Sequence, residues 1–349
     1  MRKTLALALV FGLLLGAAVF ATGQNEGAKK QIVIGKVPIT LEAQFHQALV
    51  KIETDYAMKK YGATLKVIDG QFKSDVALNA VYNFISQKVD GIILHTMDAA
   101  VLDQAIKAAH DKGIPISTFY NEPATKANPH VQINEIVTSR QMGVLAAKKW
   151  KEFYPGKAIK IGLIDYLNVE HAMQQRSNPF IEGVKSVDAT AEVVSRLDGG
   201  GSSEKALAAA QDMLQAHPEV NIVYGTNADH ALAALAAFEN AGRGKAVNGK
   251  PLTEIFVGTD ATEAELLKLF NPTSSFKITQ GLQPKANAEA EVDTMMKMVN
   301  KQLAWDKWVE IPTLDILFSY WGNKVEDGTA FLKDQYFMDV DLAKELAKK

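Results

Sequence analysis

Polar side chains recur at the ends of apolar, strand-like runs in this sequence. They are Asp98 after "IILHTM", Asn121 after "IPISTFY", Asn227 after "IVYGT", Asp260 after "IFVGT" and Gln280 after "SFKIT". Ligands of open parallel sheets bind beyond the carboxyl ends of the strands, where loops and helix N-termini present polar groups. Carboxylates accept hydrogen bonds, whereas amides both donate and accept them. The pattern therefore predicts a binding site for a small polar molecule.

Each of these side chains also has a purely structural interpretation. Asp and Asn directly before a helix are ordinary N-caps, each worth about 1 kcal/mol. Asp98 has this pattern, while Asn121 and Gln280 are poor caps and favour a ligand role more strongly. Asp260 precedes an apparent helix in "ATEAELL", so we expect its backbone to start that helix and its carboxylate to face a cleft.

The elements that must position these residues follow a βα rhythm. Strand-like runs at 32–39, 64–69, 91–95 and 114–120 alternate with amphipathic segments. The rhythm restarts after "HVQIN", with runs at 158–165, 191–198, 220–225 and 254–260. Such alternation is typical of α/β proteins with parallel sheets. Two series of this kind predict two similar lobes.

The composition narrows the classes of function. The chain has 349 residues, 47% of them hydrophobic, which suits two packed cores. A formal net charge of −2 gives no general attraction to nucleic acid or anionic membranes. The absence of Cys excludes disulfides, thiolate zinc sites and cysteine nucleophiles, and the seven His lack the spacing of metal ligands. We expect no metal, no cofactor and no nucleic-acid partner.

Two sequence patterns of nucleotide sites are absent or incomplete. "GKAVNGKP" at 244–251 approaches a phosphate-binding loop, but Pro251 stands where Ser or Thr is needed and a strand follows instead of a helix. The first strand is followed by "GKVPITLEAQ", which lacks the glycines of a dinucleotide site. No G-x-S-x-G elbow of a hydrolase occurs either.

The N-terminus has the pattern of a signal for secretion. Arg2 and Lys3 precede an uncharged run from Leu5 to Phe20, followed by a small-residue cleavage site. The run is shorter than the roughly 20 residues that span a bilayer comfortably. We expect a cleavable signal peptide over 1–21, a flexible leader over 22–30 and a periplasmic or otherwise extracytoplasmic mature protein. Retention of the segment as an anchor is the open alternative.

Six segments, in order, resemble one known family. They are "GIILHTMDAAVLDQAI", "IPISTFYNEP", "QQRSNPFIEGV", "HPEVNIVYGTNADHALAAL", "FVGTDATEAEL" and "KITQGLQPKANAEAEV". The chain is similar to the periplasmic sugar-binding proteins of ABC transporters, the type I class that includes the ribose-binding and galactose/glucose-binding proteins. The resemblance implies two doubly wound parallel-sheet lobes joined by a three-segment hinge. It places the N-terminal lobe at 31–135 and 281–311, the C-terminal lobe at 136–280 and 312–338, and a helical tail at 339–349.

The resemblance also implies a ligand set. Its expected members are the aromatic platform Phe45 and the polar residues Asn121, Arg176, Asn227, Asp260 and Gln280. Asp98, from the strand-end pattern, is expected to bind the ligand with them. This chemistry suits a sugar, because hydroxyls both donate and accept while an apolar ring face can lie on an aromatic side chain. The alternative for Phe45 is a core position of the first helix. The alternative for Arg176 is a solvated helix position.

The function implied is that of a monomeric solute-binding protein, not an enzyme, which closes two lobes around a monosaccharide and delivers it to an ABC-type membrane permease. A secreted sugar-acting α/β enzyme, or a sugar or autoinducer sensor feeding a membrane receptor, are the alternatives. One departure leaves the ligand unnamed. Where the family carries a second stacking aromatic, this chain has "GGGSS" near Gly201, and Tyr120, Tyr166 or His171 are the candidate replacements.

Overall fold

The computed structural model describes residues 31–348. The predicted signal peptide and leader lie outside this part of the chain. Within it, no helix is both long enough and apolar enough to span a bilayer.

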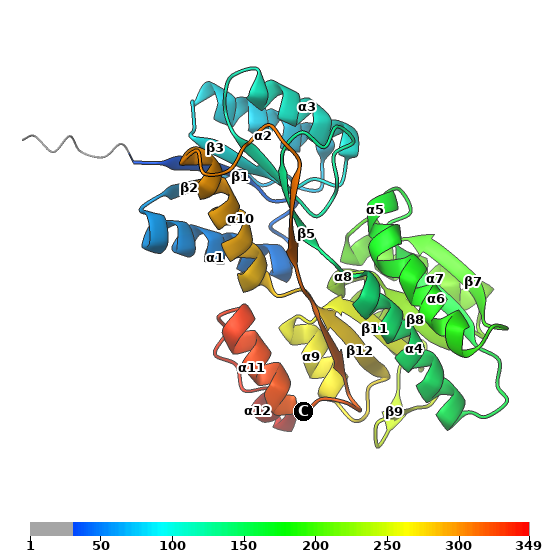
Figure 1. The fold of residues 1–349 in the computed structure, drawn as a ribbon. Helices are drawn as coiled ribbons and strands as arrows, with labels where there is room; N and C mark the ends of the chain where they lie inside the picture. Colours follow the sequence, from blue (N-terminus) through cyan, green and yellow to red (C-terminus); the bar gives the residue numbers. More distant parts are fainter. Residues whose placement is uncertain (1–30, 349) are drawn as a thin grey trace, which may run out of the picture. The chain divides into compact units, whose positions relative to one another are not determined.

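The first lobe is built on a six-stranded sheet with strand order β13-β5-β4-β3-β1-β2. All neighbouring strands in it are parallel. Its strands are β1 (Val33–Val37), β2 (Thr64–Val67), β3 (Gly91–Leu94), β4 (Ile116–Phe119), β5 (Pro129–Ile133) and β13 (Val309–Thr313). Helices cover both faces, since one core lies under α2 (Ser74–Ser86) and α3 (Ala99–His110) and others lie under α1 (Gln44–Tyr61) and α10 (Pro284–Val299) (Figure 1).

The second lobe repeats the plan with strand order β14-β12-β11-β8-β6-β7. Only its edge strand β14 runs antiparallel, against β12. The strands are β6 (Lys160–Asp165), β7 (Glu192–Asp198), β8 (Ile222–Gly225), β11 (Ile255–Asp260), β12 (Phe276–Gly281) and β14 (Ile316–Ser319). One face is covered by α4 (Ile136–Phe153) and α6 (Asn178–Val187), the other by α7 (Ser203–Ala216), α8 (Ala228–Asn240) and α9 (Glu263–Phe270). The prediction of two doubly wound parallel-sheet lobes is confirmed.

Three short connections join the two sheets. The chain passes from β5 to α4 through residues 134–135, from β12 to α10 through 282–283, and from β13 to β14 through 314–315. Beyond β14, α11 (Val325–Gln335) and α12 (Leu342–Ala347) pack against α9 of the second lobe. Leu342 is fully buried there, so the predicted tail contributes to the core of the second lobe.

One packing feature in each lobe fixes the position of its helices. Lys36 of β1 lies 2.7 Å from both Glu53 of α1 and Glu291 of α10, and none of the three side chains is exposed. In the second lobe, a Cβ on Gly143 of α4 would lie 2.1 Å from the carbonyl oxygen of Phe180 in α6. The two helices therefore meet backbone to backbone, which only glycine permits at this distance.

The segment at 244–251 contains a small antiparallel ribbon, β9 (Ala246–Val247) and β10 (Lys250–Pro251). A phosphate-binding loop needs a helix directly after its glycine-rich turn. The ribbon has no such helix, which agrees with the prediction that this segment is not a phosphate-binding loop.

Candidate functional site

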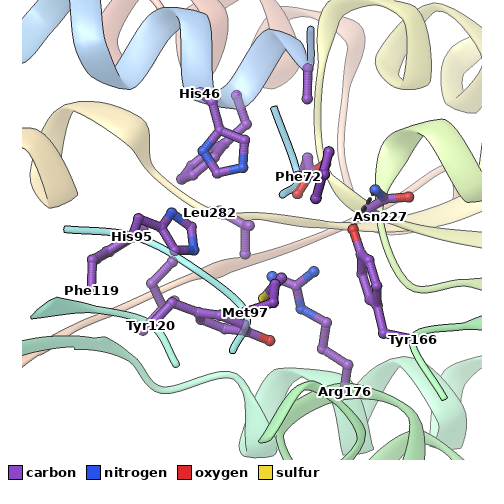
Figure 2. Close-up of a pocket in the computed structure, with 14 residues that line it drawn as sticks. His46, Phe72, His95, Met97, Phe119, Tyr120, Tyr166, Arg176, Asn227 and Leu282 are labelled. Carbon is purple, nitrogen blue, oxygen red and sulfur yellow. Dashed lines mark hydrogen bonds between the residues drawn. The ribbon is translucent and has the colours of Figure 1, made fainter. Parts of the chain in front are cut away.

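Side chains from both lobes converge on one cavity at the carboxyl edges of the two sheets. Figure 2 shows His46 and His95 on one side of it and Arg176, Tyr166 and Asn227 on the other. The free space is about 40 Å³, room for a few water molecules. Its lining is Ala43, Phe45, His46, Phe72, His95, Met97, Phe119, Tyr120, Ile133, Tyr166, Arg176, Asn227, Asp260 and Leu282. Four of the residues expected from the sequence are in this list: Phe45, Arg176, Asn227 and Asp260.

Arg176 is held in the cavity wall by a buried ion pair. It lies in a π-helical turn, η1 (Met173–Ser177), the kind of widened turn often found at functional sites. Its Nε donates to both carboxylate oxygens of Glu135, at 3.0 and 2.9 Å, and its Nη1 donates to the carbonyl of Thr226 at 2.7 Å. The guanidinium lies 4.9 Å from the centre of the Tyr120 ring. Arg176 is therefore a buried, fixed donor and not a solvated helix residue.

Asn227 has both a structural and a cavity position. It is the N-cap of α8, because its Oδ1 accepts from the backbone N–H of His230 at 2.7 Å. Its amide nitrogen donates to the hydroxyl of Tyr166 at 2.7 Å, from the edge of the cavity. One amide thus starts the helix and takes part in the cavity wall.

Asp260 occupies an unusual backbone conformation at the end of β11. Its φ is 112° and that of Ala261 is 51°, a region that non-glycine residues rarely adopt and that clusters at functional sites. Its Oδ2 accepts from the N–H of Ala228 at 3.0 Å. Burial raises the pKa of Asp260 to about 7, although the charge of Arg176 opposes the shift. The carboxylate lines the cavity in a poorly solvated environment.

The expectation that Asp260 also starts the next helix is wrong. Thr262 is the N-cap of α9, and it forms a capping box with Glu265. The strained backbone at Asp260 and Ala261 separates the strand end from the helix start, so the Asp260 carboxylate does not cap α9.

We expect Thr262→Ala to lower the free energy of unfolding by about 1 kcal/mol, the usual effect of removing an N-cap hydroxyl. Thr262→Ser retains the hydroxyl and removes only a buried methyl group, so it is the matched control and should be the more stable of the two variants. Urea denaturation followed by circular dichroism measures both. A Thr262→Ala protein as stable as the wild type would contradict the assignment of the cap.

Phe45 combines its two sequence interpretations. It is 4% exposed and belongs to a core cluster with Phe119, Tyr120 and Leu282. The same ring contributes to the lining of the cavity. An aromatic core position of α1 therefore also presents an apolar surface to the site.

Asp98, Asn121 and Gln280 do not line this cavity. Asp98 caps α3, since its side chain accepts from the N–H groups of Ala100 and Val101. Together with Asn121 it borders a separate, more open pocket nearer to solvent. Gln280 is fully buried, where its amide bonds to Ser139, Glu135 and Asp315 beside the connections between the lobes.

Within residues 31–348, no group of three or more His, Asp or Glu side chains is arranged to hold a metal ion. The chemistry of the cavity is that of hydrogen bonding and aromatic contact. Its polar groups are one cation paired with Glu135, one carboxylate, one amide, hydroxyls and imidazoles.

Comparison with known families settles the relationship of the chain. A family model described as a periplasmic binding protein domain matches residues 34–303. This chain belongs to that family. The periplasmic binding protein resemblance identified in the sequence is thereby confirmed.

Curated relatives of this periplasmic binding protein span most of its length. The ribose import binding protein of Bacillus subtilis (strain 168) is 26% identical over 242 residues, which cover 69% of this chain and 76% of that protein. The ABC transporter periplasmic-binding protein YphF of Escherichia coli (strain K12) is 24% identical over 341 residues, covering 95% of this chain and 96% of its own. A solved Mycobacterium smegmatis protein in complex with β-D-fucofuranose has a TM-score of 0.73 at 20% identity, covering 90% of this chain and 98% of that chain. The structural likeness shows a shared fold.

In this periplasmic binding protein, Gly201 lies near the position where related sugar-binding proteins carry a second stacking aromatic residue. Its φ is 74°, and a Cβ there would lie 2.9 Å from the ring of Phe72 and 3.1 Å from that of Tyr166. The space that a side chain at 201 would fill therefore holds Phe72 of the first lobe and Tyr166 of the second. Tyr166 was one of the candidate replacements, and Phe72 was not foreseen.

Sequence reasoning also missed His46 and His95 as lining residues. His46 directly follows Phe45 in the first turn of α1, and His95 directly follows β3. The signal for His95 was present in "GIILH", a strand-like run that ends in a polar residue as the others do.

Proposed function

We propose that this chain is an extracytoplasmic solute-binding protein that closes its two lobes around a small neutral sugar or cyclic polyol and delivers it to an ABC-type membrane permease. The membership in the periplasmic binding protein domain family supports the transport role. Relatives named for ribose import and a solved relative in complex with a furanose support the ligand class. The proposal includes a monomeric protein without catalytic turnover and without a nucleic-acid partner.

The observation that carries the proposal is the convergence of four predicted residues on one cavity. Phe45 comes from the first lobe, and Arg176, Asn227 and Asp260 come from the second. Together they offer an apolar ring, fixed donors and an acceptor, which matches a molecule with hydroxyls around an apolar ring face. Because both lobes line the cavity, a ligand bound there contacts both of them and favours the closed arrangement.

The charges of the cavity favour an uncharged ligand. The cation of Arg176 is already paired with Glu135, and Asp260 would repel a phosphate or carboxylate. Side chains of both lobes enclose the cavity, so we expect the lobes to part when a ligand enters. Hinge closure of this kind is an established property of periplasmic binding proteins.

A melting-shift screen tests the function. We expect at least one of D-ribose, D-allose, D-galactose and myo-inositol to raise the melting temperature by several degrees at millimolar concentration, and ribose 5-phosphate to have no effect. Equilibrium dialysis with recovery of the unchanged sugar distinguishes binding from turnover. Failure of every neutral sugar and polyol in the screen to shift the melting temperature would refute the proposal.

A pair of cap variants locates the binding site. Asn227→Ala removes the cap of α8 together with a cavity amide, and we expect it to reduce the affinity for the bound sugar about tenfold or more. Ser202→Ala removes the N-cap of α7. The Ser202 side chain accepts from the Lys205 N–H outside the cavity. The control should lose a similar amount of stability and keep its affinity. Equal affinities of the two variants, measured by titration calorimetry, would place the ligand elsewhere.

A further inference from the structure

Two histidines face each other on the first-lobe side of the cavity. His46 comes from the first turn of α1 and His95 from the end of β3. Their ring centres are 5.1 Å apart, with an angle of 62° between the ring planes. Figure 2 shows both rings bordering the space opposite Arg176 and Asn227. Neither histidine is among the residues already assigned to the ligand.

Three ring nitrogens of this pair have no hydrogen-bond partner among the described residues. They are Nδ1 of His46 and both Nδ1 and Nε2 of His95. The His95 side chain is deeply buried, at 3% exposure. A buried polar atom without a partner costs about 1–3 kcal/mol, and folded proteins satisfy most such atoms. Three of them in one cavity wall indicate that a bound molecule supplies the missing partners.

Both imidazoles are uncharged at neutral pH. Burial, helped by the charges of Lys36 and Arg176, lowers the pKa of His46 to about 3. Burial also lowers the pKa of His95, with further contributions from His46, Lys36, Arg176 and His130. A neutral imidazole has one N–H donor and one bare nitrogen acceptor. This combination matches a hydroxyl group, which donates one hydrogen bond and accepts others.

We propose that His46 and His95 form a hydroxyl-binding subsite that recognises neighbouring hydroxyls of an uncharged sugar or cyclic polyol. The inference rests on the proposed function and states which groups of the ligand, its hydroxyls, determine specificity at this subsite. A pocket built to bond a hydroxyl rejects an analogue lacking it, because its own polar atoms are then left unpaired. The aromatic surroundings of the pair, with Phe45 and Phe119 edge-on to His46 and His95, fix the rings in place.

His46→Phe and His95→Phe test the subsite, since each change keeps a flat ring and removes its nitrogens. The probe is whichever of D-ribose, D-allose, D-galactose or myo-inositol gives the largest melting shift with the wild type. We expect each variant to bind it at least tenfold more weakly by titration calorimetry. His110→Phe is the matched control, because Nε2 of His110 is also buried and unpartnered but the ring packs against Trp305 outside the cavity. This control should bind the probe as the wild type does.

Deoxy analogues and nitrogen NMR separate the subsite from general damage to the fold. We expect one monodeoxy analogue to bind the wild type at least tenfold more weakly than the probe does. That analogue should bind the variant lacking the matching ring nitrogens less than threefold more weakly than it binds the wild type. In wild-type protein with ¹⁵N-labelled histidine, saturating probe should shift the ring nitrogens of His46 and His95 but not those of His217. Undiminished affinity in both Phe variants, or unshifted ring nitrogens in a wild type that binds the probe, would overturn the subsite alone. A wild type that binds no sugar or polyol of the panel would refute the proposed function together with it.

Discussion

Glu135→Gln is expected to lower the free energy of unfolding by about 3–5 kcal/mol. The Glu135 side chain is fully buried, and that of Arg176 is 6% exposed, with 2.8 Å between Nη2 and Oε1. The substitution keeps the shape of the side chain but leaves the guanidinium buried without its counter-charge. Urea denaturation followed by circular dichroism measures the loss.

A double-variant cycle separates the ion pair from other effects of the substitution. Glu135→Gln combined with Arg176→Met removes both charges, so the double variant should recover much of the stability lost by Glu135→Gln alone. Asp111→Asn is the exposed control, because its pair with Lys107 is open to solvent and worth less than about 1 kcal/mol. A Glu135→Gln protein within 1 kcal/mol of the wild type would mean that Arg176 finds another partner.

The same ion pair connects the cavity to the links between the lobes. Glu135 lies in the connection from β5 to α4, and its Oε1 accepts from the amide of Gln280 at 3.3 Å. Gln280 also donates to Asp315 in the connection from β13 to β14, and Asp315 accepts from Thr138 at 2.6 Å. A ligand that bonds to Arg176 is therefore one contact from the connection at 134–135, and it is linked to the connection at 314–315 through Glu135 and Gln280. The position of Gln280 suits control of hinge geometry better than direct ligand contact.

The fold followed from the sequence because its signals are local. Strands ending in polar residues and alternating with Ala-rich helices specify a parallel sheet, whichever lobe they belong to. Asn227 and Asp260 reach the cavity for the same reason, since the ends of parallel strands lie at one edge. Arg176 lies in a helical turn after β6 and was expected only from the family resemblance. Gln280 shows the limit of this logic. In the sheet register it pairs with Thr259, and Gly281 is the partner of Asp260. Gln280 therefore lies one residue short of the sheet edge that carries Asp260.

What could not be foreseen depends on contacts between distant segments. His46 becomes a cavity residue only because the start of α1 lies against the end of β3, where His95 stands. Phe72 fills the place beside Gly201 from the opposite lobe, so no inspection of "GGGSS" could reveal it. Thr262 displaces Asp260 as the helix cap because two consecutive residues adopt positive φ. Sequence spacing carries no sign of that strain.

Asp260→Asn is expected to weaken binding of the panel sugar about 10- to 100-fold, the usual range for losing a charge-assisted hydrogen bond to a buried group. The amide keeps the shape of the carboxyl, can still accept from the Ala228 N–H, and tolerates positive φ. Asp229→Asn is the matched control, because Asp229 lies in the first turn of α8 and is absent from the cavity lining. Its affinity should stay within about twofold of the wild type. Titration calorimetry at pH 8 measures both.

The same substitution should have the opposite effect on stability: it weakens binding but should raise the free energy of unfolding of the ligand-free protein at high pH. The pKa of Asp260 is about 7 in the folded protein, where burial raises it, Arg176 lowers it, and Asp229 and Glu135 raise it further; an unfolded Asp has a pKa of about 3.9. Between these values the folded state binds more protons, so the contribution of Asp260 to stability falls as the pH rises from about 4 to 7. Asp260→Asn should therefore make the ligand-free protein more stable than the wild type at pH 8, by roughly 1–3 kcal/mol, and leave it little changed at pH 4.

Affinity should follow the opposite course. Only the carboxylate accepts hydrogen bonds from a ligand with both oxygens, so wild-type affinity should fall as the pH drops below about 7, by up to about tenfold per pH unit. The Asp260→Asn protein should lack this dependence. If affinity in the wild type were constant from pH 8 to 5.5, or if the variant were less stable than the wild type at pH 8, Asp260 would not be a buried acceptor held for the ligand. The ionised Asp260 would thus destabilise the ligand-free protein in the same pH range in which it strengthens binding of the sugar.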